Sequence, residues 1–285
     1  MNSVIKTVLS FTLAARAGLV LLGVDAAQAG EVGTVSRDGT IVQYHIDGKG
    51  PIVLMIPSLG RPAADFDDLS AQLVAAGYTA IRPEPRGIGG SVGPMANVTL
   101  KDLADDAMAT IPGGSGPIHV VGHAFGQRVA RMLAAQFPER VRSVVTLAAG
   151  GSAPMRPGAR EALLASFDSA LPAEAHLKAV GFAFFAEASN ASAWRDGWYP
   201  EVAKMQVAAT QATKVEEWWG AGKARMLVIQ GLQDTVAPPE NGRMIKAEFG
   251  DRVTLEELDG AGHAMLPERP SQIARAVVDF LSKQR

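Results

Sequence analysis

The sequence predicts an α/β fold in which a mainly parallel central sheet is covered by helices on both faces. Short apolar runs, such as residues 51–57 (PIVLMIP) and 118–121, are continuous, which is typical of strands buried on both faces. Other segments, such as residues 273–281, place their apolar side chains on one stripe at helical spacing. The two kinds of segment alternate along the chain, and this alternation favours a mainly parallel sheet.

The expected elements follow one another in a regular order. Residues 31–36 and 40–45 flank Asp38 and Gly39 and are expected to form a β-hairpin, which adds antiparallel strands at one edge of the sheet. The strands expected after the hairpin are residues 51–57, 79–82, 118–121, 141–149, 225–230 and 253–258. The expected helices are residues 66–77, 99–111, 125–137 and 273–281, the second of which begins at a capping signal formed by Thr99 and Asp102.

Length and composition are those of a globular protein with a sizeable core. The chain has 285 residues and no internal repeat, which fits one domain with an insertion or at most two small domains. Hydrophobic residues make up 47% of the chain and charged residues 20%, which is normal for a globular protein. The formal net charge of -2 and the lack of a Lys/Arg-rich run argue against a nucleic-acid partner.

The sequence gives no sign of a metal or a cofactor. It contains no cysteine, which excludes disulfides and thiolate metal sites, and no His/Asp/Glu cluster has the spacing of metal ligands. We therefore expect neither metal nor cofactor, and a small molecule as the partner. The oligomeric state is left open by the sequence.

The first 29 residues differ in kind from the rest. Lys6 and Arg16 are accompanied by no acidic residue, an apolar run covers residues 17–24, and small residues stand at Ala27 and Ala29. This order of basic residues, apolar run and small residues is typical of a secretory signal peptide cut after Ala29. The apolar run is shorter than the ~20 residues that a membrane span needs. An uncleaved N-terminal anchor is the alternative. We expect a periplasmic or secreted protein without stable membrane insertion after cleavage.

One segment interrupts the alternation of strands and helices. Residues 152–223 contain no convincing strand and hold all four tryptophans of the chain, Trp194, Trp198, Trp218 and Trp219. The segment is expected to form a helical lid inserted into a core made of residues 30–151 and 224–285. Its aromatic side chains are expected to line an apolar pocket above the active face; plain helical packing is the alternative.

The most informative stretch is Gly122-His123-Ala124-Phe125-Gly126. A buried strand runs into this tight Gly-x-Ala-x-Gly turn and directly on into a helix. Two further residues stand where strands end: Asp234 follows a strand and a glycine turn, and His263 lies in a glycine-rich loop after the next strand. The order along the chain is therefore turn apex, carboxylate, histidine.

With these motifs in this order, the sequence resembles the α/β-hydrolase superfamily, in its esterase and epoxide-hydrolase-like branch, over essentially all of the chain after residue 29. The resemblance implies that the Gly-x-Ala-x-Gly turn is the nucleophile elbow, whose apex usually carries a serine. Here the apex is Ala124, which has no lone pair with which to attack and no proton to give up. The chain departs from the family pattern at this position.

The resemblance also implies roles for other residues. Asp234 would hold the Nδ1–H of His263. The backbone N–H groups of Phe125 and Leu59 would form the oxyanion hole. Ser58 replaces a glycine that relatives often have and places a hydroxyl near the apex. His123 is expected to point into packing or toward the wall of the substrate pocket, and the remaining histidines that we assign to structure are His45, His119 and His176.

Several interpretations of the alanine apex stay open. It could be a sporadic replacement in an ordinary esterase, or His263 could activate water directly, or Ser58 could be a displaced nucleophile for the same histidine. Base-catalysed lyase or oxygenase chemistry without a cofactor, and binding of a small ligand without turnover, are the other two. We favour a hydrolase that acts on a small or medium, mainly apolar ester-like substrate.

Overall fold

The computed structural model describes residues 30–151 and 153–284. The predicted signal peptide, residues 1–29, lies outside the described residues. In the described part, no helix has the length and apolar character that crossing a membrane requires.

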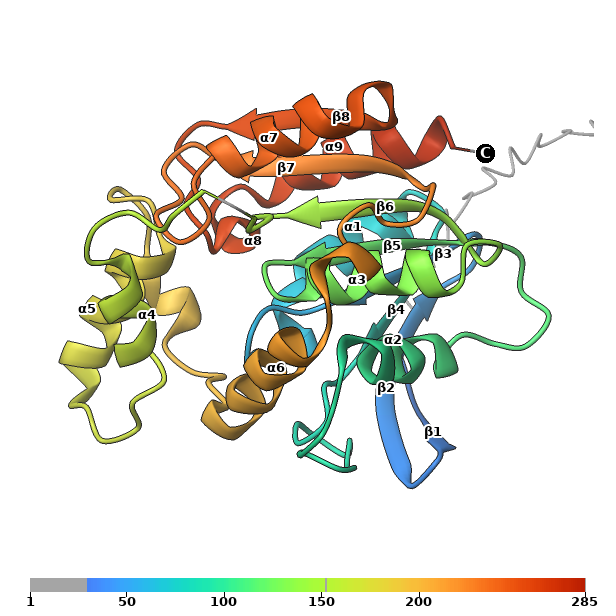
Figure 1. Cartoon of the computed structure of the whole chain (residues 1–285), viewed down its shortest axis with the longest axis horizontal. Helices are drawn as coiled ribbons and strands as arrows, with labels where there is room; N and C mark the ends of the chain where they lie inside the picture. Colours follow the sequence, from blue (N-terminus) through green and yellow to red (C-terminus); the bar gives the residue numbers. More distant parts are fainter. Residues whose placement is uncertain (1–29, 152, 285) are drawn as a thin grey trace, which may run out of the picture.

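The centre of the structure is an eight-stranded sheet with the order β1-β2-β4-β3-β5-β6-β7-β8 (Figure 1). The first two strands form the predicted antiparallel hairpin, β2 pairs antiparallel with β4, and all other neighbours pair in parallel. The prediction of a mainly parallel sheet is confirmed. The strands are β1 (Glu31–Arg37), β2 (Thr40–Gly48), β3 (Ile52–Ile56), β4 (Thr79–Pro83), β5 (Ile118–His123), β6 (Val141–Leu147), β7 (Arg225–Gly231) and β8 (Val253–Leu258).

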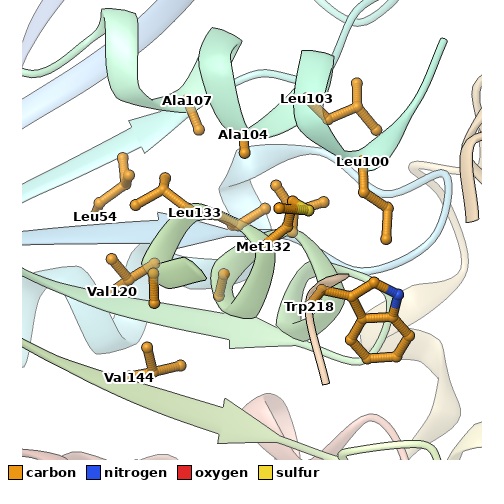
Figure 2. Close-up of a cluster of buried hydrophobic side chains, with 14 of the residues drawn as sticks. Leu54, Leu100, Leu103, Ala104, Ala107, Val120, Met132, Leu133, Val144 and Trp218 are labelled. Carbon is orange, nitrogen blue, oxygen red and sulfur yellow. The ribbon is translucent and has the colours of Figure 1, made fainter. Parts of the chain in front are cut away.

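Helices cover both faces of the sheet, as the sequence predicts. One face packs against α2 (Leu100–Ala109), α3 (Gly126–Gln136) and α7 (Glu240–Phe249), and the other against α1 (Asp67–Ala75), α8 (Met265–Glu268) and α9 (Pro270–Ser282). Helix α2 begins at the predicted capping box of Thr99 and Asp102. Successive strand residues point to opposite faces. Val120 packs in the cluster with α2 and α3 (Figure 2), and Val121 packs on the opposite face of the sheet.

The segment between β6 and β7 is helical in its described residues, with α4 (Ala159–Ala165), α5 (Ala173–Phe184), α6 (Pro200–Ala212) and the short 3₁₀ turns η2 (Ala191–Trp194) and η3 (Val215–Glu217). Helices α4 and α5 lie beyond the carboxyl ends of the central strands (Figure 1). Helix α6 differs, because its Val202 and Met205 belong to the hydrophobic core under α2 and α3. One part of the insertion therefore adds to the core, and the other part projects beyond the edge of the sheet.

The parallel strands place several loops at one end of the sheet, where the carboxyl ends of the strands meet. The β5–α3 turn lies at the centre of this end, because β5 pairs with β3 on one side and with β6 on the other. The loops after β3, β6, β7 and β8 lie at the same end of the sheet. This arrangement brings together the residues that the sequence singled out.

Candidate active site

The turn between β5 and α3 has the geometry of an elbow. Ala124 has a φ of +48°, in the left-handed region, and its N–H donates to the carbonyl of Leu147 at 2.8 Å. The two glycines of the motif are required by close backbone contacts, since a Cβ at Gly122 would collide with the Gly126 carbonyl, and one at Gly126 with the Ile56 carbonyl. The fold thus keeps the strained apex although the residue there is an alanine.

Ala124→Gly is expected to raise the free energy of unfolding by up to about 1 kcal/mol. A left-handed conformation costs an L-residue roughly 1–2 kcal/mol, and the greater freedom of glycine in the unfolded chain offsets part of this gain. Urea unfolding followed by tryptophan fluorescence measures the change. Clear destabilisation of the variant would show that the buried methyl group contributes more to packing than the backbone strain costs.

His263 and Asp234 form a buried pair beside the elbow. The Nδ1 of His263 lies 2.9 Å from Oδ2 of Asp234, and the two residues are 5% and 2% exposed. The other carboxylate oxygen, Oδ1, accepts the amide N–H groups of Val236 at 2.9 Å and Ala237 at 2.7 Å. These bonds hold the carboxylate in one orientation, so that His263 donates its Nδ1–H and leaves Nε2 available as a proton acceptor.

The loop that carries His263 is tied down from several directions. The carboxylate of Glu268 accepts the N–H of Gly262 and the N–H of Ala186, both at 2.7 Å, and so joins the loop to the end of α5. His123 donates its Nε2–H to the carbonyl of His263 at 2.7 Å. Burial lowers the pKa of His123 to about 3, so that its ring is neutral at physiological pH.

The loop after β3 supplies the second half of the site. The N–H groups of Leu59 and Phe125 have no acceptor among the described residues. The adjacent N–H of Gly60 differs, because it donates to Oε1 of Gln206 at 2.8 Å and anchors the loop to α6. Ser58 is buried and lines the same cavity, but no hydrogen bond joins its hydroxyl to His263.

A comparison of the sequence with known protein families agrees with this geometry. Residues 51–270 match the family model described as alpha/beta hydrolase fold. The chain belongs to the α/β-hydrolase family.

Individual relatives are named as hydrolases. Over 263 residues the chain is 28% identical to a protein from Variovorax paradoxus (strain S110) that is provisionally named the carbamate hydrolase RutD. The matched region covers 85% of this chain and 95% of the relative. It is 34% identical over 101 residues to 2-(acetamidomethylene)succinate hydrolase from Mesorhizobium japonicum, covering 35% and 36% of the two chains. An alanine-for-serine variant of the meta-cleavage product hydrolase CumD from Pseudomonas fluorescens IP01, complexed with acetates, has the same fold, with 22% identity, a TM-score of 0.72 and coverage of 89% and 99%.

In this hydrolase the elbow opens into a cavity of 460 Å³ between the sheet edge and the insertion. Ala124, Phe125 and His263 lie at its base together with Ser58 and Leu59. The apolar part of its wall comes from the insertion and the loop after β7, with Leu163, Phe167, Phe184, Trp194, Trp198 and Val236. Most of the wall is therefore suited to an apolar ligand.

The four tryptophans divide into two pairs, which differs from the prediction that all of them line the substrate pocket. Trp194 and Trp198 line the cavity as predicted. Trp218 and Trp219 do not: they border a neighbouring pocket, and Trp218 is buried in the hydrophobic core beside α2 and α3 (Figure 2). There the guanidinium of Arg131 lies 4.8 Å from the centre of the Trp219 ring.

Of the two positions expected for His123, the structure shows the one in packing: the side chain does not line the cavity, so its assignment to the substrate pocket is wrong. Its ring is completely buried behind Trp194, with 5.8 Å between the two ring centroids. The reason is the alternation along β5, which directs this side chain to the loop of His263, where its hydrogen bond supports the backbone. Two further residues of the site, Glu268 and Arg128, were not predicted from the sequence, because a single charged residue forms no recognisable motif.

Two of the arginines that line the cavity differ in whether a carboxylate pairs with them. Arg61 is buried and forms a two-pronged ion pair with Asp65, with N–O distances of 2.8 and 2.7 Å. Its guanidinium also lies 4.4 Å from the ring centre of Trp194. Arg128 contacts no carboxylate in the described part of the chain. Within the same described residues, no group of three or more His, Asp or Glu side chains is arranged to hold a metal ion.

Proposed function

We propose that the protein is an exported hydrolase that cleaves a small or medium, mainly apolar ester-like substrate by direct attack of water. In this proposal His263 is the general base, Asp234 orients it, and the N–H groups of Leu59 and Phe125 hold the oxyanion. The observation that carries the proposal is the combination of a buried His–Asp pair and two free amide donors with an apex that offers only the methyl group of Ala124.

The reaction follows from these positions. Water attacks the carbonyl carbon of the ester while Nε2 of His263 accepts one of its protons. The negative charge on the carbonyl oxygen is stabilised by the two amide donors, and Asp234 stabilises the imidazolium. When the tetrahedral intermediate collapses, the imidazolium gives the proton to the leaving alcohol. The products are a carboxylic acid and an alcohol, and no bond to the enzyme forms.

The turnover rate expected of such an enzyme indicates which substrates it can cleave. In a serine protease, removal of the catalytic group costs about 2 × 10⁶ in kcat, and a residual ~10³–10⁴ over water comes from the oxyanion hole and binding. That residual rate is the same whether or not the histidine is kept, so retaining a base is not sufficient by itself. A site whose histidine is positioned to activate water is expected to exceed the residual rate and to fall short of a serine enzyme. It therefore suits acyl groups with good leaving groups. The provisional name of the Variovorax relative, a carbamate hydrolase, supports hydrolysis of an acyl compound.

The first test separates the base from the displaced nucleophile. His263→Gln is expected to lower kcat for p-nitrophenyl esters by at least roughly 10²-fold, because general base catalysis contributes about 10²–10⁴. Ser58→Ala is expected to leave kcat within about tenfold, because only a neighbouring hydroxyl is lost. Steady-state release of p-nitrophenolate measures both changes.

The matched control is His45→Gln, on β2, where the ring lies 3.5 Å from Glu84 and far from the cavity lining. Its activity should equal that of the unaltered protein. A loss of several orders of magnitude in Ser58→Ala would show that Ser58 is the nucleophile. Full activity in His263→Gln would contradict the proposal and leave a binding protein or a different site.

A further inference from the structure

Arg128 stands out among the charged side chains of the hydrolase. It lies on α3 four residues after Ala124, so that about one helical turn, roughly 6 Å of rise, separates it from the elbow apex. It lines the cavity that contains His263, together with Gly150 and Gly151 of the loop after β6, and it also lines the neighbouring pocket that Trp218 and Trp219 border. The side chain is half-buried. It is thus placed where it can contact a ligand that also reaches the elbow.

The guanidinium of Arg128 has no anionic partner in the described part of the chain. It takes part in no ion pair and no side-chain hydrogen bond there, and the aromatic ring that it faces, Trp218, is 5.5 Å from the guanidinium carbon. Burial lowers the pKa of Arg128, and no acidic group opposes the shift. A half-buried cation of this kind is costly to keep, because desolvation weakens the charged form and nothing compensates for it.

The other arginines nearby show that this state is specific to Arg128. Arg61, in the same cavity, is neutralised by Asp65. Arg160 lines the outer part of the cavity and is exposed, so that water solvates its charge. Arg131, one turn further along α3, is completely buried, with a pKa lowered to about 9 by burial and by Arg128, and it does not line the cavity. Only Arg128 of these four is partly desolvated, uncompensated and open to a ligand.

We propose that Arg128 binds a carboxylate of the substrate, and that the natural substrate is an acyl compound with a carboxylate at the end remote from the bond that is cleaved. A guanidinium presents its N–H donors in a planar fork that matches the two oxygens of a carboxylate. The apolar wall would hold the carbon chain between this carboxylate and the reacting carbonyl. The assignment of the reacting end rests on the proposed hydrolase function, whereas the carboxylate site itself does not.

A pair of non-hydrolysable ligands tests the carboxylate site by itself. The ligands are 6-oxoheptanoate and its primary amide, 6-oxoheptanamide, which have equal length and a ketone in place of the ester. Binding is followed by quenching of tryptophan fluorescence, because Trp194 and Trp198 line the cavity. The unaltered protein is expected to bind the carboxylate at least tenfold more tightly than the amide, as for a charge-assisted hydrogen-bonded pair.

Three variants locate the origin of this preference. Arg128→Met is expected to abolish it, and Arg128→Lys to retain part of it, because lysine keeps the charge and loses the fork. Arg275→Met, which removes an exposed arginine of α9 outside the cavity lining, should leave the preference unchanged. Because Arg128→Met also removes an uncompensated charge, it should unfold at the same temperature as the unaltered protein or higher, and it should lose the upward shift of Tm that 6-oxoheptanoate produces.

The outcomes are distinguishable from those of the hydrolase test. Equal binding of both ligands, binding of neither ligand by the unaltered protein, or a preference that survives Arg128→Met would each overturn the carboxylate site. A preference that disappears in Arg128→Met supports it, even in a protein that hydrolyses no ester. In that last case the carboxylate site would stand and the proposed function would fail.

Discussion

Ala124→Ser is expected to raise the turnover of p-nitrophenyl esters by roughly two to four orders of magnitude, because loss of a serine nucleophile costs even more in enzymes that use one. The parts that a serine needs are already in place. The apex has the left-handed backbone of an elbow, with φ at +48°. The Nδ1 of His263 is held at 2.9 Å from Asp234, and the amide donors of Leu59 and Phe125 are free.

A change of mechanism should accompany the gain in rate. The Ala124→Ser variant is expected to release a burst of p-nitrophenolate equal to the enzyme concentration, with an acyl group detectable on residue 124 by mass spectrometry. The unaltered protein should show neither. Ala124→Gly serves as the control, because it changes the same position without adding a hydroxyl.

The absence of a gain would be equally informative. It would mean that His263 does not reach a group at the apex, and that the Gly-x-Ala-x-Gly turn has lost its catalytic geometry as well as its nucleophile. The stability of Ala124→Ser should stay close to that of the unaltered protein, because serine and alanine have the same backbone restriction and the new hydroxyl faces the cavity.

The fold was predictable from the sequence because its signals are local. The continuous apolar run of residues 118–121 specifies a strand buried on both faces, and Gly122 is dictated by contacts within one turn. Gly126 differs, because the carbonyl of Ile56 at the end of β3 leaves no room for a Cβ there. The order of Ala124, Asp234 and His263 then places all three at one edge, because parallel strands end there. Asp234 and His263, which are 29 residues apart in the sequence, indeed meet at hydrogen-bond distance.

The composition of the cavity was only partly predictable, because it depends on contacts between distant segments. Nothing in the sequence distinguishes the environment of Trp194 from that of Trp218. In the folded chain, Trp194 lines the cavity, whereas Trp218 follows α6 and borders the neighbouring pocket. Arg61 and Arg128 likewise look alike in the sequence. They differ in the structure, where Asp65 pairs with Arg61 and no acidic residue of the described part of the chain pairs with Arg128.

Acid is expected to destabilise the protein strongly below pH 6.5, because two buried histidines must stay neutral in the folded state. His119 is buried beside Ser143, with 2.8 Å between Nδ1 and Oγ, and burial together with Arg142 lowers its pKa to about 4. Burial, His263 and Arg61 lower the pKa of His123 to about 3. Both values lie below the ~6.5 of a histidine in an unfolded chain.

The sign follows from proton binding. Between pH 6.5 and about 4 the unfolded state binds a proton on each of these histidines and the folded state does not, so the free energy of unfolding rises with pH and falls on acidification. Each histidine contributes a slope of about 1.4 kcal/mol per pH unit in this range, and the pair is expected to remove on the order of 4 kcal/mol between pH 6.5 and 5. This is a large share of the 5–15 kcal/mol that is typical of a folded domain.

Urea unfolding at pH 7, 6, 5 and 4, followed by tryptophan fluorescence, measures this dependence, and His119→Asn isolates one of its sources. The variant loses the packing of the ring against Tyr78, whose centroid is 6.3 Å away, so it should be less stable at pH 7. Its slope against pH should nevertheless be shallower by about 1.4 kcal/mol per pH unit, because one of the two groups that bind a proton only on unfolding is gone. Tyr78→Leu, which disturbs the same ring packing but keeps His119, is the matched control and should keep the full slope. If the slope of His119→Asn equalled that of the unaltered protein, the loss of stability in acid would have to come from carboxylates such as Asp102, whose pKa is lowered by the hydrogen bonds of the α2 capping box, although burial acts in the opposite direction.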